Sequence, residues 1–533
     1  MRGFLLLALA LFTATPGVVT TIATGARISG ANGIHFGPDG LLYVTSVIGS
    51  ELVVLDPETG AVRKRFTPAE GVSGPDDVAF APDGSYYWTS ILTGEVVGFR
   101  PDGTRVVAGK VTPGVNPLTF SDDGRLFVSQ CFFDDKLYEM DPAGVKPPRL
   151  IRGDLGPRCG LNGMDWGPDG RLYGPRWFRG EVVSIDVDSG EMVTVASGFK
   201  TPAAVKFDGK GRLHVLDTLA GDVIRVDGDQ RTVVAHLTPG LDNFAFDAKG
   251  RLFVSSFVDG FVARVEPDGS LAYLSPGGMA HPGGVATRGG VIVVADFHAV
   301  RFFDAATGKQ SKVQPNVLGM SPIGSSLSVS TDGANLILCS WVDGDVRVWD
   351  PAAEKVLERY TDLGQPVSAV RFGSAIAVAE HKQHRVVALE KGAMTVIAKD
   401  LAAPTGLAVL DGDLFLTDRK SGEVLRLTRG GKALAEPEVL ARGLVDPEGI
   451  TAFAGGLAVV ESSAGRVAFV SLAGKVTPIA TVTANKSIGS DAQPPSFIFN
   501  GIAAGADGAL YLADEHDRSL VRVAVPKDSL PAK

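Results

Sequence analysis

The sequence lacks the features that point to a membrane span, a nucleic-acid partner or a disulfide-rich scaffold. It has only 3 cysteines in 533 residues, which allow at most one internal bridge. Beyond a short apolar run near the N-terminus, no segment approaches the ~20 apolar residues that cross a bilayer. The net charge is -9, and lysine and arginine form no block. This argues against a nucleic-acid partner, because basic side chains must neutralise its phosphates. We therefore expect a small-molecule substrate or ligand, with a protein partner as the alternative.

The common catalytic signatures are missing as well. The sequence contains no His-Glu-x-x-His, Cys-x-x-Cys or Gly-x-Ser-x-Gly motif and no phosphate-binding loop. Each of these motifs fixes a ligand, redox pair or nucleophile at a set spacing, so the classes that depend on them are not supported. Any chemistry must come from residues that the fold brings together.

Glycine and proline, by contrast, are plentiful. The 66 glycines and 32 prolines indicate many tight turns. Apolar residues make up 45% and charged residues 21%, which is ordinary for a folded globular protein. The length exceeds what one hydrophobic core usually supports, so at least two domains are expected.

Residues 1–17 are typical of an export signal. Arg2 supplies a basic start, residues 4–12 an apolar core, and residues 13–17 the small side chains of a cleavage site. We expect cleavage between Ala14 and Gly17 and an exported protein, periplasmic or secreted. A buried N-terminal strand is the alternative.

One pattern recurs about twelve times along the chain. Residues 32–46 and 162–176 both contain a short apolar strand, a Pro-Asp-Gly turn and a second strand. The Asp-Gly pair supplies the positive φ that tight hairpins need, and the strands alternate with a period of two. The copies recur at the spacing of a four-stranded propeller blade, roughly 40 to 50 residues. These features predict an all-β protein with almost no helix.

Twelve blades exceed the usual range of about 4 to 8 for one ring, so we predict two tandem six-bladed β-propellers. The predicted domains are residues 18–275 and 276–533. The last copy stops after its third strand, residues 519–525, whereas residues 18–24 precede the first copy and resemble a fourth strand. We predict that residues 18–24 complete the sixth blade and residues 269–274 the twelfth, so that no sheet edge stays open.

The residues that lead the first strand of each blade should line the channel of each propeller. In the first ring five of the six carry a side-chain oxygen, whereas in the second ring they are mostly small, as at Gly283, Ser325 and Thr405. Converging carboxylates and carboxamides are the hard donors that Ca²⁺ or Mg²⁺ prefers. One divalent cation is therefore the predicted cofactor, with backbone capping by Asn and Asp as the alternative. The predicted metal ligands are Asn32, Asp76, Asn116, Asn162 and Asp242, and the sixth leading residue is Ala203.

The segment Asn162-Gly-Met-Asp-Trp, followed by Gly-Pro-Asp-Gly-Arg-Leu-Tyr, resembles the metal-ligand asparagine motif of the senescence-marker-protein/gluconolactonase family of six-bladed propellers. Asn116 falls where that family keeps another polar site residue. The resemblance covers about residues 25–275, and it implies a lactone hydrolase that uses one divalent cation. Asn32 replaces the family's first-blade Glu, and Ala203 replaces an expected ligand Asp. More loosely, the second half resembles NHL repeats and virginiamycin B lyase.

If the first ring is catalytic, Asp242 or Asp76 is the candidate base. The loop after the second strand opens on the same face, where Arg176 would hold an anionic or carbonyl group and Asp217 is a further candidate. Aromatic residues of these loops would form a mouth, with packing between blades as the alternative. They are Phe132, Phe133, Trp177 and Phe178.

The second ring has acidic residues at the ends of its second strands, where an Asp is typical of a structural bond to the next loop. These residues are Asp296, Glu380, Asp418, Glu461 and Asp514. A carboxylate and histidine site also remains open there. Its candidates are His298, Glu380, His381, His384, Glu448, Glu515 and His516.

Three functions are therefore open. The first is an exported, metal-dependent hydrolase of a lactone or related ester. The second is a non-catalytic NHL-like propeller that binds a small ligand or a protein partner. The third is a C–O lyase similar to virginiamycin B lyase.

Cys131 and Cys159 are predicted to form a disulfide. Cys131 opens the loop after the second strand of the third blade, and Cys159 precedes the first strand of the fourth. These segments lie on the same face of adjacent blades, so the usual Cα separation of ~5.5 Å is attainable. Cys339, in a buried strand of the other ring, stays free. Three unpaired thiols are the alternative.

Overall fold

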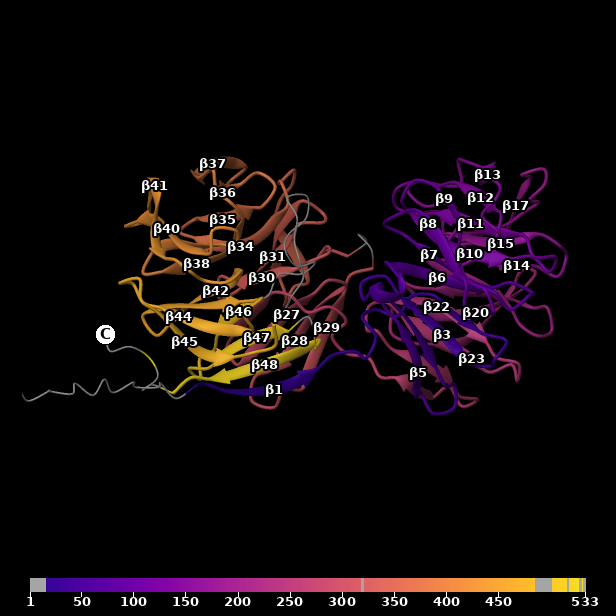
Figure 1. Cartoon of the computed structure of the whole chain (residues 1–533), viewed down its shortest axis with the longest axis horizontal. Helices are drawn as coiled ribbons and strands as arrows, with labels where there is room; N and C mark the ends of the chain where they lie inside the picture. Colours follow the sequence, from indigo (N-terminus) through magenta and orange to yellow (C-terminus); the bar gives the residue numbers. More distant parts are fainter. Residues whose placement is uncertain (1–15, 318–320, 485–500, 515–516, 527–529, 531–533) are drawn as a thin grey trace, which may run out of the picture. The chain divides into compact units, whose positions relative to one another are not determined.

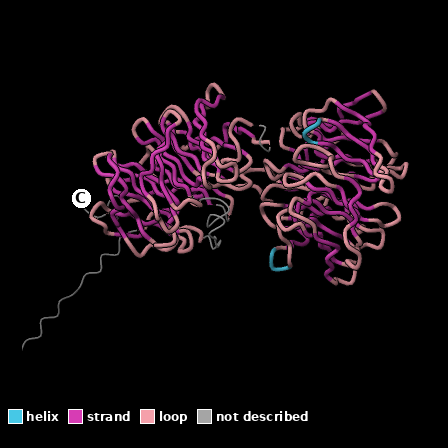
Figure 2. Tube along the Cα trace, turned by 90° about the horizontal axis from the view of Figure 1, so that it is seen from above, coloured by secondary structure: helices cyan, strands magenta, loops and turns pink. Residues whose placement is uncertain are grey.

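The structure is a computed structural model, and it describes residues 16–317, 321–484, 501–514, 517–526 and 530. Within these residues the chain forms 48 strands and two single-turn 3₁₀ helices, η1 (Pro68–Glu70) and η2 (Trp177–Arg179). The strands form twelve four-stranded antiparallel sheets. Figure 2 shows the strands in magenta and the helical turns in cyan. The prediction of two six-bladed β-propellers with almost no helix is confirmed.

The six blades of the first propeller follow one another in the chain, each from its inner to its outer strand. Their strands are β2 (Ile34–Phe36), β3 (Leu42–Ser46), β4 (Glu51–Leu55) and β5 (Val62–Phe66); β6 (Pro75–Phe80), β7 (Tyr86–Ser90), β8 (Glu95–Phe99) and β9 (Arg105–Lys110); β10 (Val115–Phe120), β11 (Leu126–Gln130), β12 (Leu137–Met140) and β13 (Arg149–Arg152); β14 (Asp165–Trp166), β15 (Leu172–Arg176), β16 (Glu181–Ile185) and β17 (Met192–Ser197); β18 (Pro202–Phe207), β19 (Leu213–Asp217), β20 (Asp222–Asp227) and β21 (Gln230–His236); β22 (Leu241–Phe246), β23 (Leu252–Ser256), β24 (Val262–Val265) and β25 (Leu271–Ser275).

The second propeller begins at β26, and its last blade includes the first strand of the chain. Its strands are β26 (Val285–Arg288), β27 (Val291–Asp296), β28 (Ala299–Asp304) and β29 (Gln310–Pro315); β30 (Ser328–Thr331), β31 (Leu336–Ser340), β32 (Asp345–Asp350) and β33 (Lys355–Tyr360); β34 (Pro366–Phe372), β35 (Ala375–Glu380), β36 (Arg385–Glu390) and β37 (Ala393–Ala398); β38 (Pro404–Leu410), β39 (Asp413–Asp418), β40 (Glu423–Arg429) and β41 (Lys432–Ala441); β42 (Pro447–Phe453), β43 (Gly456–Glu461), β44 (Arg466–Val470) and β45 (Val476–Thr481); β46 (Ile502–Ala504), β47 (Leu510–Asp514), β48 (Ser519–Ala524) and β1 (Val18–Thr24).

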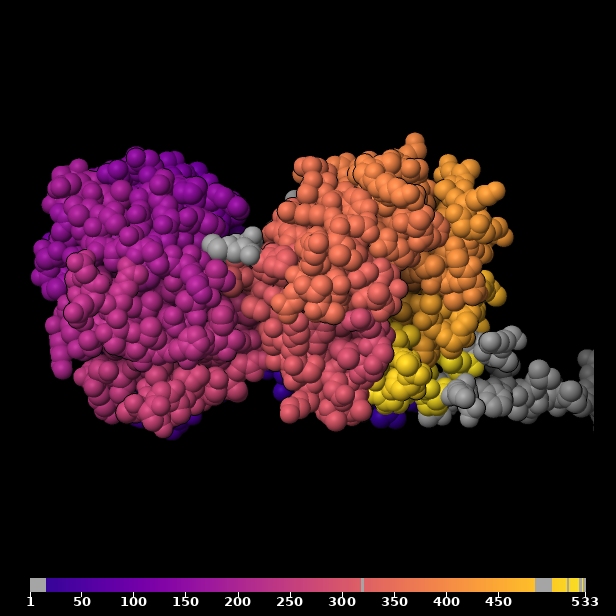
Figure 3. Space-filling view, turned by 180° about the vertical axis from the view of Figure 1, so that it is seen from behind, coloured from indigo at the N-terminus to yellow at the C-terminus, as the bar shows by residue number. Residues whose placement is uncertain are grey.

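The N-terminal strand β1 closes the second propeller, not the first. It pairs antiparallel with β48, with Val18 opposite Ala524 and Thr24 opposite Ser519. Figures 1 and 3 show the indigo β1 against the yellow C-terminal strands. The sixth blade of the first propeller instead takes its outer strand, β25, from the hairpin with β24. The predicted closure was therefore wrong, and the predicted domain 18–275 loses its first strand.

A local turn explains the correction. Asp268 and Gly269 join β24 to β25, Gly269 has φ 83°, and the Asp268 carboxylate accepts the amide of Ser270 at 2.9 Å. This is the same Asp-Gly hairpin that joins strands elsewhere in the repeat. A short hairpin loop costs less closure entropy than a strand from a distant part of the chain.

The chain divides into two compact units that follow from this topology. One spans Gly25–His281 and includes Pro315–Ser321, and the other joins β1 to Pro282–Gln314 and to the chain from Pro322 onward. The first propeller is therefore an insertion between the outer strand of the twelfth blade and the rest of the second propeller.

Aromatic pairs join every neighbouring pair of blades in the first propeller. The last residue of each inner strand is Phe or Trp, and its ring meets a ring from the second strand of the preceding blade at centroid distances between 4.9 and 5.5 Å. Such contacts add roughly 0.5–1.5 kcal/mol each to the burial of the rings. The pairs are Phe36–Phe253, Phe80–Tyr43, Phe120–Tyr87, Trp166–Phe127, Phe207–Tyr173 and Phe246–His214. The first pair joins the last blade to the first, so it helps to close the ring without a shared strand.

The predicted disulfide between Cys131 and Cys159 is present, and Cys339 is free and buried. The bridge spans 28 residues of sequence and joins adjacent blades. Two backbone bonds align the bridged segments: Cys131 donates to Gly114 at 2.7 Å, and Gly160 donates to Gln130 at 2.8 Å.

The predicted export signal falls almost wholly on residues 1–15, which lie outside the described part of the chain. Val18 already belongs to β1, in agreement with the expectation that 18–24 is a strand. Within the described residues, no helix is long and apolar enough to span a bilayer.

Candidate functional site

Hydroxyl groups of neighbouring blades position the leading residues around the first axis. Thr45 Oγ1 donates to the Asp76 carbonyl at 2.6 Å, and Thr89 Oγ1 donates to the Asn116 carbonyl at 2.7 Å. Ser255 Oγ makes the matching bond from the sixth blade to the Asn32 carbonyl, also at 2.6 Å. Each bond runs from the second strand of one blade to the leading residue of the next, so the first three blades have their leading residues held in place.

Asp76 and Asp242 form the electrostatic centre of this ring. Asn32 lies between their blades and donates from Nδ2 to Asp242 Oδ1 at 3.4 Å. Burial, with the carboxylates of Asp242 and Asp77 next, raises the pKa of Asp76 well above its ordinary value. Burial and the charge of Asp77 raise the pKa of Asp242 to about 7, although the Asn32 amide opposes the shift. At pH 7 the Asp242 carboxyl is therefore about half protonated, whereas an isolated carboxyl would be ionised.

A second layer of polar residues lies one position further along the inner strands. Asn243 Nδ2 lies 3.5 Å from Asp77 Oδ1, and both residues are buried. Gly33 of the intervening blade leaves the space, because a Cβ at that position would collide with the Asp77 carboxylate. Burial raises the pKa of Asp77 to about 6, although the nearby Lys206 ammonium opposes the shift.

A third layer contains charged groups that sequence reasoning missed. Lys206 is buried, donates to the Met164 carbonyl at 3.2 Å and acts on both Asp77 and Asp165. Burial and the Lys206 charge lower the pKa of His35 to about 4, so this imidazole is neutral at pH 7. The available signal was a set of ionisable residues three positions after the leading residue of blades one, four and five.

The five predicted metal ligands do not all present oxygen to one point. Asn32 Oδ1 accepts the Val47 amide at 3.0 Å, and Asn162 Oδ1 accepts the Gly163 amide at 2.9 Å. Asn116 Oδ1 is buried without a hydrogen-bond partner. Among the described residues, no group of three or more His, Cys, Asp or Glu is arranged to hold a metal. The donors still available are therefore the carboxylates of Asp76 and Asp242 and the amide oxygen of Asn116, while Ala203 offers none.

Arg176 and Asp217 hold loops closed. The Arg176 guanidinium donates to the Leu155 carbonyl and to Glu181 Oε1, the latter at 2.6 Å. The Asp217 carboxylate accepts three backbone amides, from Lys200, Thr201 and Ala220, at 2.7, 3.0 and 3.2 Å. Both side chains end the second strand of their blade and bind the segment before its inner strand. These bonds explain their positions without a substrate.

The predicted aromatic mouth is divided between core and surface. Trp177 is 1% exposed and belongs to the core, whereas Phe133 is 64% exposed. Leu92 of the second blade and Leu219 of the fifth blade also lie in the loop after the second strand, and both are exposed. The loops around the first ring therefore offer apolar side chains to solvent.

In the second ring the bond to the next loop predicted for the strand-end acids is confirmed at Asp418 and at Asp514, whose carboxylate accepts the Asp517 amide at 3.2 Å. Glu380 and Glu461 instead bond the segment before the inner strand of their own blade. The Asp418 carboxylate accepts the amides of Ala402 and Ala403, at 2.8 and 3.0 Å, and that of Ser421 in the next loop at 3.1 Å. Glu380 accepts the Gly364 amide at 2.7 Å, and Glu461 accepts the Val445 amide at 2.8 Å.

The histidine candidates of the second ring are partly described. Glu448 is buried, and Arg419 Nε lies 3.3 Å from its Oε1. The rings of His381 and His384 are 6.5 Å apart. Glu515 and His516 lie outside the described residues. The register also corrects two leading residues. Leu327, not Ser325, leads the eighth blade, because its amide donates to Cys339 just as the Asn32 amide donates to Thr45. Val367, not Ser368, leads the ninth blade, because the preceding Pro366 pairs with Glu380 just as Pro404 pairs with Asp418 before Thr405.

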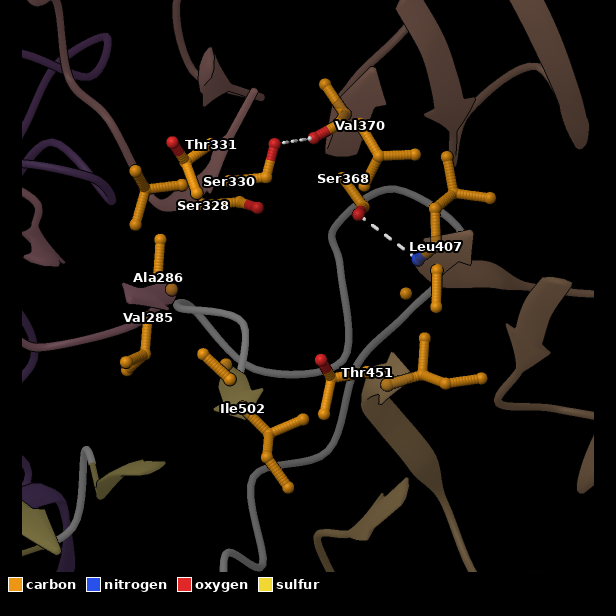
Figure 4. Close-up of a pocket in the computed structure, with 18 of the residues that line it drawn as sticks. Val285, Ala286, Ser328, Ser330, Thr331, Ser368, Val370, Leu407, Thr451 and Ile502 are labelled. Carbon is orange, nitrogen blue, oxygen red and sulfur yellow. Dashed lines mark hydrogen bonds between the residues drawn. The ribbon is translucent and has the colours of Figure 1, made fainter. Parts of the chain in front are cut away.

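A cavity of about 260 Å³ occupies the axis of the second propeller. The inner strands of all six blades line it, and Figure 4 shows their side chains around the opening. Most of its lining residues have small side chains, among them Gly284, Ser328 and Ala503.

Comparisons with known proteins give no family assignment. No protein-family profile matches the chain, and no curated protein matches it in sequence. Virginiamycin B lyase from Staphylococcus aureus is 13% identical, with 52% of this chain and 96% of that chain covered and a TM-score of 0.37. A streptogramin B lyase is 15% identical, with 56% and 98% covered and a TM-score of 0.38. The extracellular domain of a candidate one-component system from B. thetaiotaomicron is 10% identical, with 97% and 83% covered and a TM-score of 0.33. At these TM-scores the fold rests on the strand pairing alone.

Proposed function

We propose that this protein is an exported hydrolase of a lactone or related ester, with its site on the axis of the first propeller. The observation that carries the proposal is the pair Asp76 and Asp242, two carboxyl groups whose pKa values are raised by burial and by neighbouring carboxylates. Such a pair weakens the fold, and groups of this kind concentrate at functional sites.

The two carboxyl groups suit acid and base roles near neutral pH. With a pKa of about 7, Asp242 is divided between its two protonation states and can accept a proton from an attacking water. Burial also raises the pKa of Asp76 well above its ordinary value, and in its protonated form Asp76 can donate to the leaving oxygen. Asn32 orients Asp242 through its amide.

The remaining oxygen donors also suit one divalent cation, Ca²⁺ or Mg²⁺. The carboxyl oxygens of Asp76 and Asp242 would ligate such a cation after losing their protons, and Asn116 Oδ1 is a buried acceptor without a hydrogen-bond partner. When bound, such a cation supplies polarisation of the ester carbonyl.

The surroundings favour a neutral, partly apolar substrate. Arg176, which could have bound an anion, is engaged by Glu181, and the axis itself is rich in carboxyl groups. Phe133 and Leu92 offer exposed apolar surface in the loops nearby. A lactone ring is uncharged, so it meets these conditions.

A panel of neutral lactones and aryl esters tests the proposal, assayed with and without a chelator. Asp242→Asn should lower kcat/KM by roughly 10² or more, because it removes the base. Asp76→Asn and Asp242→Asn should each abolish stoichiometric binding of Ca²⁺ or Mg²⁺, whereas Glu448→Gln, in the other propeller, should retain it. Full activity in both first-ring variants would refute the site, and full cation binding in both would refute the cation.

A further inference from the structure

The axial cavity of the second propeller contains hydroxyl groups that the fold does not use. Ser328 is 5% exposed, and no residue of the described chain accepts from or donates to its hydroxyl. Figure 4 shows the hydroxyls of Ser328, Ser368 and Thr451 turned toward the interior of the cavity. A hydroxyl that faces a cavity and has no partner among the described residues is available to a ligand in that cavity.

The neighbouring serines leave both donors and acceptors available. Ser368 Oγ accepts the Leu407 amide at 3.2 Å, so its proton remains free to donate. Ser330 Oγ donates to the Ala369 carbonyl at 2.7 Å, so its lone pairs remain free to accept. A hydroxyl group both donates and accepts, and it therefore matches such a mixed lining better than an amine or a carboxylate does.

The cavity lining is almost free of charge. Its only ionisable side chain among the described lining residues is Arg371, at the end of the inner strand. Arg371 Nη2 lies 3.2 Å from Asp332 Oδ2 and 3.6 Å from Glu358 Oε1, so acidic partners already compensate it. A charged ligand would find no counter-ion inside.

Blade packing explains the glycines of the cavity but not the hydroxyls. A Cβ at Gly284, Gly406 or Gly501 would collide with the backbone of the next blade, so these positions serve the close approach of inner strands. An alanine at Ser328 or Thr451 would remove no hydrogen bond to a described residue. The hydroxyls are therefore the features that call for a ligand.

From these observations we propose that the axial cavity of the second propeller binds one small neutral molecule with several hydroxyl groups, of the monosaccharide or cyclitol class. The volume of about 260 Å³ lies just below the range of roughly 300–1,000 Å³ typical of sites for drug-sized ligands, as expected for a molecule of one ring. This site does not depend on the hydrolase activity proposed for the first propeller.

Isothermal titration of the full-length protein tests the site with D-glucose and myo-inositol as neutral probes, and with gluconate and glucosamine as charged ones. We expect saturable one-to-one binding of at least one neutral probe and none of the charged pair. Ser328→Ala and Thr451→Ala should each weaken binding about three- to tenfold, the effect of one neutral hydrogen bond. Ser328→Leu, which fills the cavity, should abolish binding.

Ser326→Ala is the matched control, because the Ser326 hydroxyl bonds the Ile323 carbonyl and does not line the cavity. It should bind like the unmodified protein, and thermal unfolding should show that each variant is folded. The proposal is overturned if neither neutral probe binds at millimolar concentration, or if Ser328→Leu and Ser326→Ala bind equally well. Tighter binding of gluconate than of glucose would also overturn it.

Discussion

Asp242 illustrates how a single carboxyl group can oppose the stability of the propeller that holds it. In the unfolded chain its pKa is near 3.8, and in the folded protein it is about 7. Between these values the folded state binds more protons than the unfolded state, so the free energy of unfolding falls as pH rises through this window. Above about pH 7 the penalty is complete.

Asp242→Asn should therefore stabilise the first propeller at pH 8, by about 2–4 kcal/mol, and have no such effect at pH 4. Urea unfolding at both pH values, followed by hydrogen exchange of the first-propeller strands, measures the difference. Asp413→Asn is a control of opposite sign. Burial raises the pKa of Asp413, but the hydrogen bonds to its carboxylate, chiefly from Arg426, together outweigh burial and hold this pKa low. Removing the Asp413 carboxylate should therefore destabilise the fold above pH 4. Equal effects of Asp242→Asn at the two pH values would contradict the assignment.

The disulfide provides a second prediction at this scale. Replacing Cys131 and Cys159 by serine should lower the free energy of unfolding by about 2–4 kcal/mol, because the unfolded chain loses a closed loop. Peptide mapping without reduction should recover the two cysteines as one cross-linked pair. Cys339, which is buried, should react with an alkylating agent only after unfolding. Alkylation of Cys131 in the native protein would disprove the bridge.

The sequence was sufficient to find Asp76 and Asp242, because leading residues recur at a fixed place in each repeat. It did not predict Asp77, Lys206 or Asp165, whose importance depends on which neighbour of the leading residue turns inward in each blade. It also suggested Arg176 and Asp217 as site residues. Their role depends on backbone amides and carbonyls brought close by loops, and a pattern of side chains does not reveal those partners.

At the scale of elements, the two rings differ most at the ends of their inner strands. Phe207→Ala removes one of the six aromatic pairs of the first propeller, with Tyr173 at 4.9 Å. We expect the free energy of unfolding to fall by about 2–3 kcal/mol. This is less than a fully buried Phe would cost, because the Phe207 ring is only partly buried. Amides of blades four and five should exchange faster.

Val409→Ala in the second propeller is the matched comparison, since Val409 is the next-to-last residue of the inner strand β38 and lines the open cavity. It should cost less than about 1.5 kcal/mol and leave the first propeller unchanged. Equal exchange in blades four and five of the Phe207 variant and the unmodified protein would show that the aromatic contacts do not join the blades.

Most strands were predictable, because Asp-Gly turns mark many of the hairpins and period-two alternation marks their strands. The outer strands were harder to assign. β1 and β25 are both short, partly exposed and rich in β-branched or apolar residues, so side chains hardly distinguish their partners. The deciding factor was chain connectivity: β25 is joined to β24 by a tight turn, which leaves β1 for β48.

At the scale of the whole molecule, the N-terminal strand belongs to the second propeller. Deleting residues 18–24 should expose the edge of β48 and destabilise β46–β48, whereas the first propeller should stay intact. Hydrogen exchange followed by mass spectrometry should show at least about tenfold faster exchange in β46–β48. Faster exchange in β22–β25 instead would show that residues 18–24 complete the sixth blade, as the sequence predicted.

The pairing of β1 with β48 also sets an order of assembly. Of the described strands, β1 is synthesised first and its partner β48 last. All strands of the inserted first propeller are present by residue 275, so this propeller can fold before β1 has its partner β48. A chain that stops before β48 therefore has a complete first propeller and an open second propeller. The unpaired strand β1 and the open sheet edge of the second propeller are the kind of surface that a chaperone or protease recognises.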